Sequence, residues 1–176
     1  MGSIDKKLNV LRQIAEVFNE KQITWAIGAS VLLYFKGLAD DFHDIDIMAA
    51  EKDVAVIKDI LLPMGEMMPP GPDVQYATKH FMEFRVEGID IDVIAGFTII
   101  KGEEEHYFPL KEEQILDHTE IGGIKIPLHS LEEWRLYYEL MGRTEKVKMI
   151  DSHQRNPLCQ TVGSARKRAK RNFYVM

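Results

Sequence analysis

Two aspartates separated by a single isoleucine constrain the fold of this chain more than any other feature. Residues two apart in a β-strand point to the same face, so Asp44 and Asp46 project together while Ile45 enters the core. A small-residue segment, Gly28-Ala29-Ser30, follows the apolar stretch 23–27 and ends fourteen residues before Asp44. This spacing predicts a strand, a tight turn that opens a short helix, and a second strand that returns beside the turn.

A later stretch, residues 89–94, again alternates apolar residues with two acids, Asp90 and Asp92. Two such strands place several like charges together, which is costly unless cations compensate them. Carboxylate oxygens are ligands that Mg²⁺ accepts, and the free backbone N–H groups at a helix start can hold phosphates. The combination indicates Mg²⁺-dependent nucleotide chemistry.

The order of these segments resembles that of the DNA polymerase β-type nucleotidyltransferase superfamily. More narrowly, it is similar to the small prokaryotic members grouped with antibiotic nucleotidyltransferases and the nucleotidyltransferase toxins of abortive-infection systems. The resemblance covers roughly residues 20–150 and extends to the segments 123–128 and 142–146. It implies an α+β fold, an α/β sandwich in which a small mixed β-sheet carries helices mainly on one face.

The resemblance also implies an activity and the residues that carry it. The expected reaction moves a nucleoside monophosphate from an NTP, with ATP as the first candidate, to an acceptor and releases pyrophosphate. Two Mg²⁺ ions would be held by Asp44, Asp46 and Asp92, with Asp90 as the alternative third acid. The acceptor stays open between a small molecule, a tRNA end and a protein side chain. A catalytically silent relative that binds nucleotide or a partner protein is the competing hypothesis.

Other residues are candidates for binding the two substrates. Gly28 lets the backbone approach phosphate oxygens. Ser30 can donate its hydroxyl to them, cap the following helix, or do both. The expected triphosphate-binding cations and the expected acceptor-side histidines are Arg143, Lys146, His43 and His80. No Walker-type phosphate loop and no Gly-x-Ser-x-Gly motif occurs in the sequence, which disfavours P-loop and serine-hydrolase chemistry.

Hydrophobic periodicity predicts the remaining elements. Two amphipathic helices are expected near residues 8–18 and from about Lys52, the second limited by Pro63. Hairpins are expected at 81–94 and 115–126, and residues 63–73 read as a loop. Ser130 and Glu133 have the spacing of a capping box that opens a helix.

Charge and composition set the expected domain organisation and location. Net charge is −6, although five basic residues gather near the end, at Arg166, Lys167, Arg168, Lys170 and Arg171. An acidic body is a poor general nucleic-acid binder, while the basic segment could contact RNA or an acidic protein, or be a solvated end. We expect one domain over 1–151 and a flexible basic tail over 152–176.

Several absences favour a cytoplasmic protein. No apolar run approaches the roughly 20 residues that span a bilayer, so no membrane association is expected. The first residues lack the apolar stretch of a secretory signal. Cys159 is the single cysteine, which suits a reducing compartment.

Overall fold

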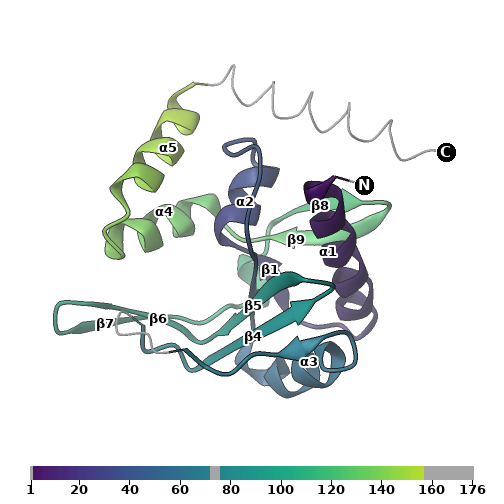
Figure 1. Cartoon of the computed structure of the whole chain (residues 1–176). Coiled ribbons are helices and arrows are strands. Elements are labelled where there is room, and N and C mark those ends of the chain that lie inside the picture. The colour runs from purple at the N-terminus through teal and green to yellow at the C-terminus, as the bar shows by residue number, and fades with distance from the viewer. Residues whose placement is uncertain (1, 72–75, 157–176) are drawn as a thin grey trace.

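The computed structural model of the chain describes residues 2–71 and 76–156 (Figure 1). The helices are α1 Ser3–Glu20, α2 Ala29–Phe35, α3 Val54–Leu61, α4 Leu131–Leu140 and α5 Thr144–Arg155, with short 3-10 turns at Glu51–Asp53 and Glu112–Gln114. The strands are β1 Trp25–Ile27, β2 Ile45–Ala49, β3 Glu66–Met67, β4 His80–Val86, β5 Ile89–Ala95, β6 Phe97–Lys101, β7 Glu104–Phe108, β8 Asp117–Ile121 and β9 Ile124–Leu128. Cys159 and the basic residues of 166–171 lie outside the described residues.

Within the described ranges, a seven-stranded mixed sheet runs in the order β3-β4-β5-β2-β1-β9-β8. Strand β2 is antiparallel to β1 and parallel to β5, while β1 is parallel to β9. The hairpins β4–β5 and β8–β9, both of which were predicted, flank the central strands, and the short strand β3 lies outside β4 at one edge. The expected α+β architecture is therefore confirmed.

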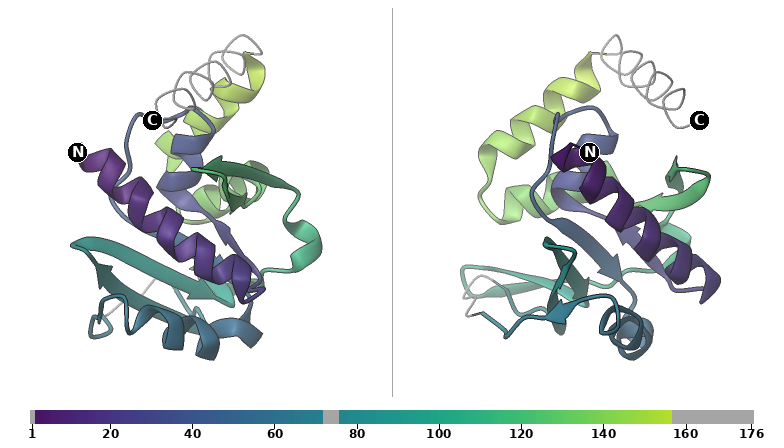
Figure 2. Two further views of the ribbon diagram at one scale, coloured as in Figure 1. Left: turned by 90° about the vertical axis from the view of Figure 1, so that its right-hand side faces the viewer. Right: turned by 45° about the vertical axis from the view of Figure 1, so that its right-hand side comes forward.

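The core lies between the sheet and the helices that cross it. Ile45 and Ile47 of β2 are fully buried, as their alternation with the acids predicts. Helix α1 buries one stripe, including Leu11, Ile14 and Phe18, and packs on β8, β9 and α3. Figure 2 shows α1 running diagonally across the sheet. No helix in the described part of the chain is long and apolar enough to cross a membrane.

Some elements differ from the sequence-based expectation. The hairpin β6–β7 forms a separate two-stranded sheet. It was not predicted, because the run of glutamates at 103–105 obscures the alternation of apolar and polar residues in β7. Residues 66–67, expected in a loop, form the short strand β3 against β4. Helix α5 continues to Arg155, so residues 152–155 are helical and not part of a tail.

The capping box predicted at the start of α4 forms only in part. The Glu133 N–H donates to Ser130 Oγ at 3.3 Å, as expected for the N-cap. The Glu133 carboxylate does not return to the backbone of Ser130 but accepts from Gln114 Nε2 at 3.3 Å and lies 3.2 Å from His129 Nε2. Glu133 therefore links the start of α4 to Gln114 and His129 in the segments before it.

A buried lysine fixes the loop that leads into β2. Lys7 of α1 is only 8% exposed, and its ammonium lies 3.0 Å from Asp41 Oδ1 and also donates to the Phe42 carbonyl oxygen. The ammonium holds the pKa of Asp41 below its usual range, with a second contribution from the Phe42 N–H. Helix α1 is therefore tied directly to the residues just before Asp44.

We expect Lys7→Met to destabilise the protein by about 1–3 kcal/mol, because the Phe42 carbonyl loses its buried donor while the side-chain volume is roughly kept. The measurement is urea unfolding. Lys6→Met, at an exposed position on the same helix, is the control and should change the free energy of unfolding by less than about 0.5 kcal/mol. Equal effects of the two substitutions would contradict this role of Lys7.

Candidate active site

Carboxylates from three neighbouring strands form a row across one face of the sheet. The parallel register of β2 and β5 pairs Asp46 with Asp92, and the antiparallel register of β4 and β5 pairs Glu83 with Asp92. Asp90 lies two residues before Asp92 in β5, hence on the same face. Asp44 directly precedes β2 and lines the same pocket as Glu83, Asp90 and Asp92. The four aspartates expected from the sequence are therefore brought together.

The structure distinguishes the two candidates for the third acid. Asp92 is the direct neighbour of Asp46, whereas Asp90 accepts from Arg85 Nε at 2.8 Å in an exposed ion pair. Glu83 was missed by the sequence analysis, although a signal was present. The two-residue turn at 87–88 fixes the hairpin register, and this register places Glu83 opposite Asp92.

Burial and mutual repulsion raise the pKa values of the central acids. The pKa of Asp46 rises to about 8, mainly through burial and then through Asp92 and Asp44, while Arg143 acts in the opposite direction. The pKa of Asp92 rises to about 7, again mainly through burial, followed by Asp44, Glu83 and Asp90. A cation bound between these carboxylates would lower their pKa values and favour the ionised forms.

The donor set suits a hard divalent cation, because carboxylate oxygens are the ligands that Mg²⁺ accepts. Among the described residues, however, no group of three or more histidine, cysteine, aspartate or glutamate side chains is arranged to hold a metal ion. The fit therefore rests on Asp46 and Asp92, which are direct strand neighbours and whose pKa values are raised by burial and then by the surrounding carboxylates.

The small-residue turn lies directly against the second strand. The Gly28 N–H donates to the Asp46 carbonyl oxygen at 3.0 Å, which joins the turn to the acid strand. Ala29 has φ +46°, a left-handed conformation that is uncommon outside glycine and costs roughly 1 kcal/mol or more. Ser30 lies inside the first turn of α2 and does not cap this helix, so the capping alternative is wrong.

Gly28 is required here for space. Its φ of −121° is open to any residue, but a Cβ at this position would lie 2.4 Å from Trp134 Cζ2 and 2.8 Å from Trp134 Nε1. Trp134 is buried in α4 and stacks on Phe97 of β6. The indole thus packs edge-on against the turn, a contact between segments a hundred residues apart that no local pattern indicates.

The turn between α4 and α5 supplies a cation. Arg143 lies in this turn, and its charge favours the ionised form of Asp46. Asp46 and burial both raise the pKa of Tyr138, burial being the larger cause, which places this phenol near the acid. Arg135 of α4 binds Asp151 of α5 through Nε at 2.5 Å and Nη2 at 3.2 Å. This ion pair holds the two helices together around Arg143.

The remaining candidates lie less centrally. Lys146 is in the first turn of α5, and no contact among the described residues joins its side chain to the acids. His43 is exposed directly before Asp44. His80 pairs with Ala95 at the far end of β5 and, three residues from Glu83, faces the opposite side of β4. The structure therefore brings His43 toward the acids and leaves His80 away from them.

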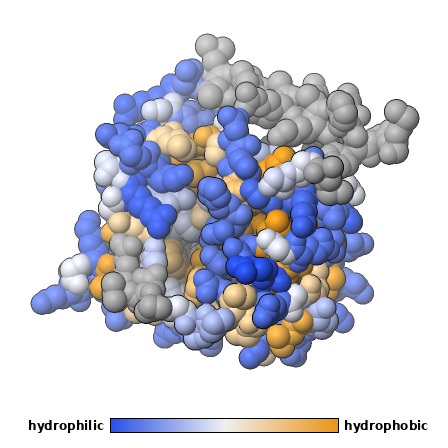
Figure 3. Space-filling view, in the orientation of Figure 1, coloured by the Kyte–Doolittle hydropathy of each residue, from blue (hydrophilic) through white to orange (hydrophobic). Residues whose placement is uncertain are grey.

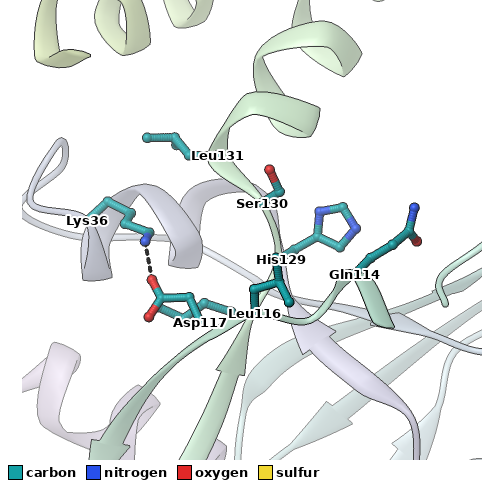
Figure 4. A pocket seen from close by; sticks show the side chains of 8 residues that line it. Lys36, Gln114, Leu116, Asp117, His129, Ser130 and Leu131 are labelled. Atoms are coloured by element: carbon teal, nitrogen blue, oxygen red, sulfur yellow. Dashed lines mark hydrogen bonds and ion pairs between the residues drawn. The ribbon is translucent and has the colours of Figure 1, made fainter. Parts of the chain in front are cut away.

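Most of the face shown in Figure 3 is hydrophilic, with apolar side chains in smaller patches. A pocket of about 220 Å³ opens beside the acid row between β4, β5 and residues 68–69. A second pocket of about 220 Å³ lies at the junction of β9 and α4, where Lys36 pairs with Asp117 and the buried His129 lies below Ser130 (Figure 4). Burial lowers the pKa of His129 to about 4, so its imidazole is neutral at physiological pH.

Comparison with solved structures identifies the fold. A proposed nucleotidyltransferase from Thermotoga maritima, TM1012, has a TM-score of 0.67 and 23% identity over 86% of this chain and 94% of its own. ANT(2")-Ia, solved in complex with adenylyl-2"-tobramycin, has a TM-score of 0.57 and 13% identity over 94% of this chain and 98% of its own. LnuA, a lincosamide antibiotic adenylyltransferase solved with bound lincomycin, has a TM-score of 0.56 and 16% identity over 81% of this chain and 94% of its own.

The chain therefore has the nucleotidyltransferase fold, which confirms the resemblance at the level of fold. No family model matches the sequence, and no curated protein matches it either.

We expect Gly28→Ala to destabilise the protein by about 1–3 kcal/mol, because the added methyl overlaps the rigid indole of Trp134. Gly71→Ala is the control, since a Cβ there meets nothing within 4 Å. Urea unfolding measures both. In a Trp134→Phe background the cost of Gly28→Ala should fall, and a cost that stays unchanged would contradict the overlap.

We expect Asp46→Asn to be more stable than the wild type at pH 8.5, with a smaller advantage at pH 5 and none below the ordinary pKa of 3.8. The folded pKa of about 8 lies above the ordinary 3.8, so the folded state holds a proton that the unfolded chain releases between these values. The contribution of Asp46 to the stability of the wild type therefore falls as pH rises through this window. The substitution removes this contribution to the pH dependence, while that of Asp92, whose pKa rises to about 7, remains.

Thermal melting at both pH values, without metal or nucleotide, checks this expectation. Asp59→Asn, at an exposed position of α3, is the control and should retain the wild-type slope. A mutant that melts several degrees below the wild type at pH 8.5 would show that Asp46 is a satisfied structural carboxylate.

Proposed function

We propose that this protein is a Mg²⁺-dependent nucleotidyltransferase that transfers a nucleoside monophosphate from an NTP to an acceptor hydroxyl or phosphate. The observation that carries the proposal is the pairing of Asp46 with Asp92, with Asp44 on the same face and the Gly28 turn hydrogen-bonded to Asp46. ATP is the first candidate donor, because one protein of similar fold, LnuA, is an adenylyltransferase by name and another was solved with an adenylylated antibiotic.

Asp44, Asp46 and Asp92 would hold two Mg²⁺ ions in this proposal. When bound, such ions stabilise the attacking and leaving oxygens of the transferred phosphoryl group. Ser30 and the backbone at Gly28 would contact the phosphates, and Arg143 would offset their charge. Lys146 is the second candidate cation, one turn further along α5.

The reaction forms one bond and breaks one bond at the α-phosphorus. The acceptor oxygen bonds to this phosphorus, while the bond to the bridging oxygen breaks and pyrophosphate leaves with the electron pair. The acceptor proton is lost to a carboxylate of the site or to water. His43 is the candidate to orient the acceptor, because it directly precedes Asp44.

We also propose where the protein acts in the cell and what its basic C-terminal residues contact. A cytoplasmic site of action fits the single cysteine and the acidic composition. The basic residues of 166–171 are proposed to contact RNA or an acidic protein surface. Neither is needed for nucleotidyl transfer itself.

Incubation with α-labelled NTPs, Mg²⁺ and a cell extract tests the activity. We expect a labelled product with one NTP, released pyrophosphate, and a loss of at least about 100-fold in Asp44→Ala. Asp59→Ala is the matched control and should retain activity. Nucleotide binding without turnover in the wild type would overturn the enzyme in favour of a catalytically silent relative.

A further inference from the structure

We propose that two copies of this chain associate through the outer edge of β8, independently of the proposed transfer reaction. Strand β8 ends the seven-stranded sheet, and β9 is its one neighbouring strand in the described part of the chain. The opposite end of the sheet, β3, has only two residues, whereas β8 has five. An edge strand of this length can serve as a template for a further strand.

The alternation of hydrogen bonds in the β8–β9 hairpin identifies the backbone groups that face outward. Gly122 and Gly123 both have positive φ, as in a two-residue type I′ turn, so Ile121 and Ile124 form a hydrogen-bonded pair. Bonded and non-bonded pairs alternate from there, which places His118 and Glu120 in non-bonded pairs. The N–H and C=O groups of these two residues therefore point away from β9.

These outward groups restrict how two β8 strands can pair about a two-fold axis. Pairing Glu120 with itself places two carboxylates opposite each other, and pairing His118 with itself forms one bonded pair within β8. The antiparallel register centred on Thr119 instead pairs each His118 with the second copy's Glu120 and forms two bonded pairs. A two-fold axis makes the two pairs equivalent, as in most homodimers.

The side chains are complementary in this register. His118 and Glu120 are exposed, and neither side chain makes a hydrogen bond or ion pair with the residues that the structure describes. The imidazole N–H of one copy can therefore donate to the carboxylate of the other, a favourable cross-strand pair. Leu116, directly before β8, is 88% exposed and would be partly covered by the second copy's turn at 122–123.

One outward group is already bonded within the chain. The His118 N–H donates to Asp117 Oδ1 at 2.8 Å. The Glu120 N–H and the His118 carbonyl have no such partner among the described residues, so they form two bonds across the axis without breaking any. Exchange of Asp117 for the second copy's Glu120 carbonyl adds two more.

Sedimentation equilibrium of the full chain, across a range of protein concentrations, tests the proposal. Glu120→Pro removes an outward N–H but no bond between β8 and β9. Glu105→Pro is the matched control, since Glu105 has the same place beside the two-residue turn of β7. The residue that would face it in a second copy, Tyr107, is already bonded to Glu51.

Two charge variants test the register separately. His118→Glu places carboxylates opposite each other across the axis, and combining it with Glu120→Lys makes the facing charges opposite again. Urea unfolding shows whether each variant folds. If Glu120→Pro does not fold, the charge variants decide.

We expect the wild type to reach twice the mass of one chain, with a dissociation constant raised at least about 100-fold by Glu120→Pro and unchanged by Glu105→Pro. His118→Glu should weaken association about tenfold, and the added Glu120→Lys should restore it. A wild type that stays monomeric, as it would if its own C-terminal residues covered β8, would overturn the proposal. Equal effects of the two prolines, or no restoration in the double variant, would do the same.

Discussion

The parallel pairing of β2 with β5 is the constraint on which the candidate site depends. Each strand presents isoleucine or valine to the core and aspartate to the other face. A slip of one residue would exchange the two faces, burying the acids and exposing the apolar side chains. The register is thus enforced by the hydrophobic face, and the repulsion among the acids is tolerated because the opposite face is buried.

Segments remote in sequence then fix the surroundings of this pair of strands. Lys7 of α1 anchors the loop before Asp44, and Arg143 from the α4–α5 turn faces Asp46. Trp134 of α4 presses on Gly28, so the demand for glycine in the turn comes from packing and not from its dihedral angles. The acid row is local to the sheet, but its position depends on three helices.

Local patterns in the sequence were sufficient to predict most helices and strands and much of the candidate site. Alternation placed Asp44 and Asp46 on one face, and the turn at 87–88 defined the β4–β5 hairpin. The resemblance favoured Asp92 over Asp90 as the third acid, but the direct pairing of Asp92 with Asp46 depends on the contact of β2 with β5, two distant segments whose pairing periodicity does not encode. The contact of Trp134 with Gly28 could not be predicted for the same reason, because it joins distant segments. The position of Glu83 opposite Asp92 follows from the hairpin register and was overlooked.

The ion pair between Arg135 and Asp151 gives the α4–α5 pair a mechanical property. Because it bridges the two helices, they form one rigid hairpin with Arg143 at its vertex. The ion pair therefore also fixes the place of the positive charge that favours the ionised form of Asp46, although neither of its partners belongs to the acid row.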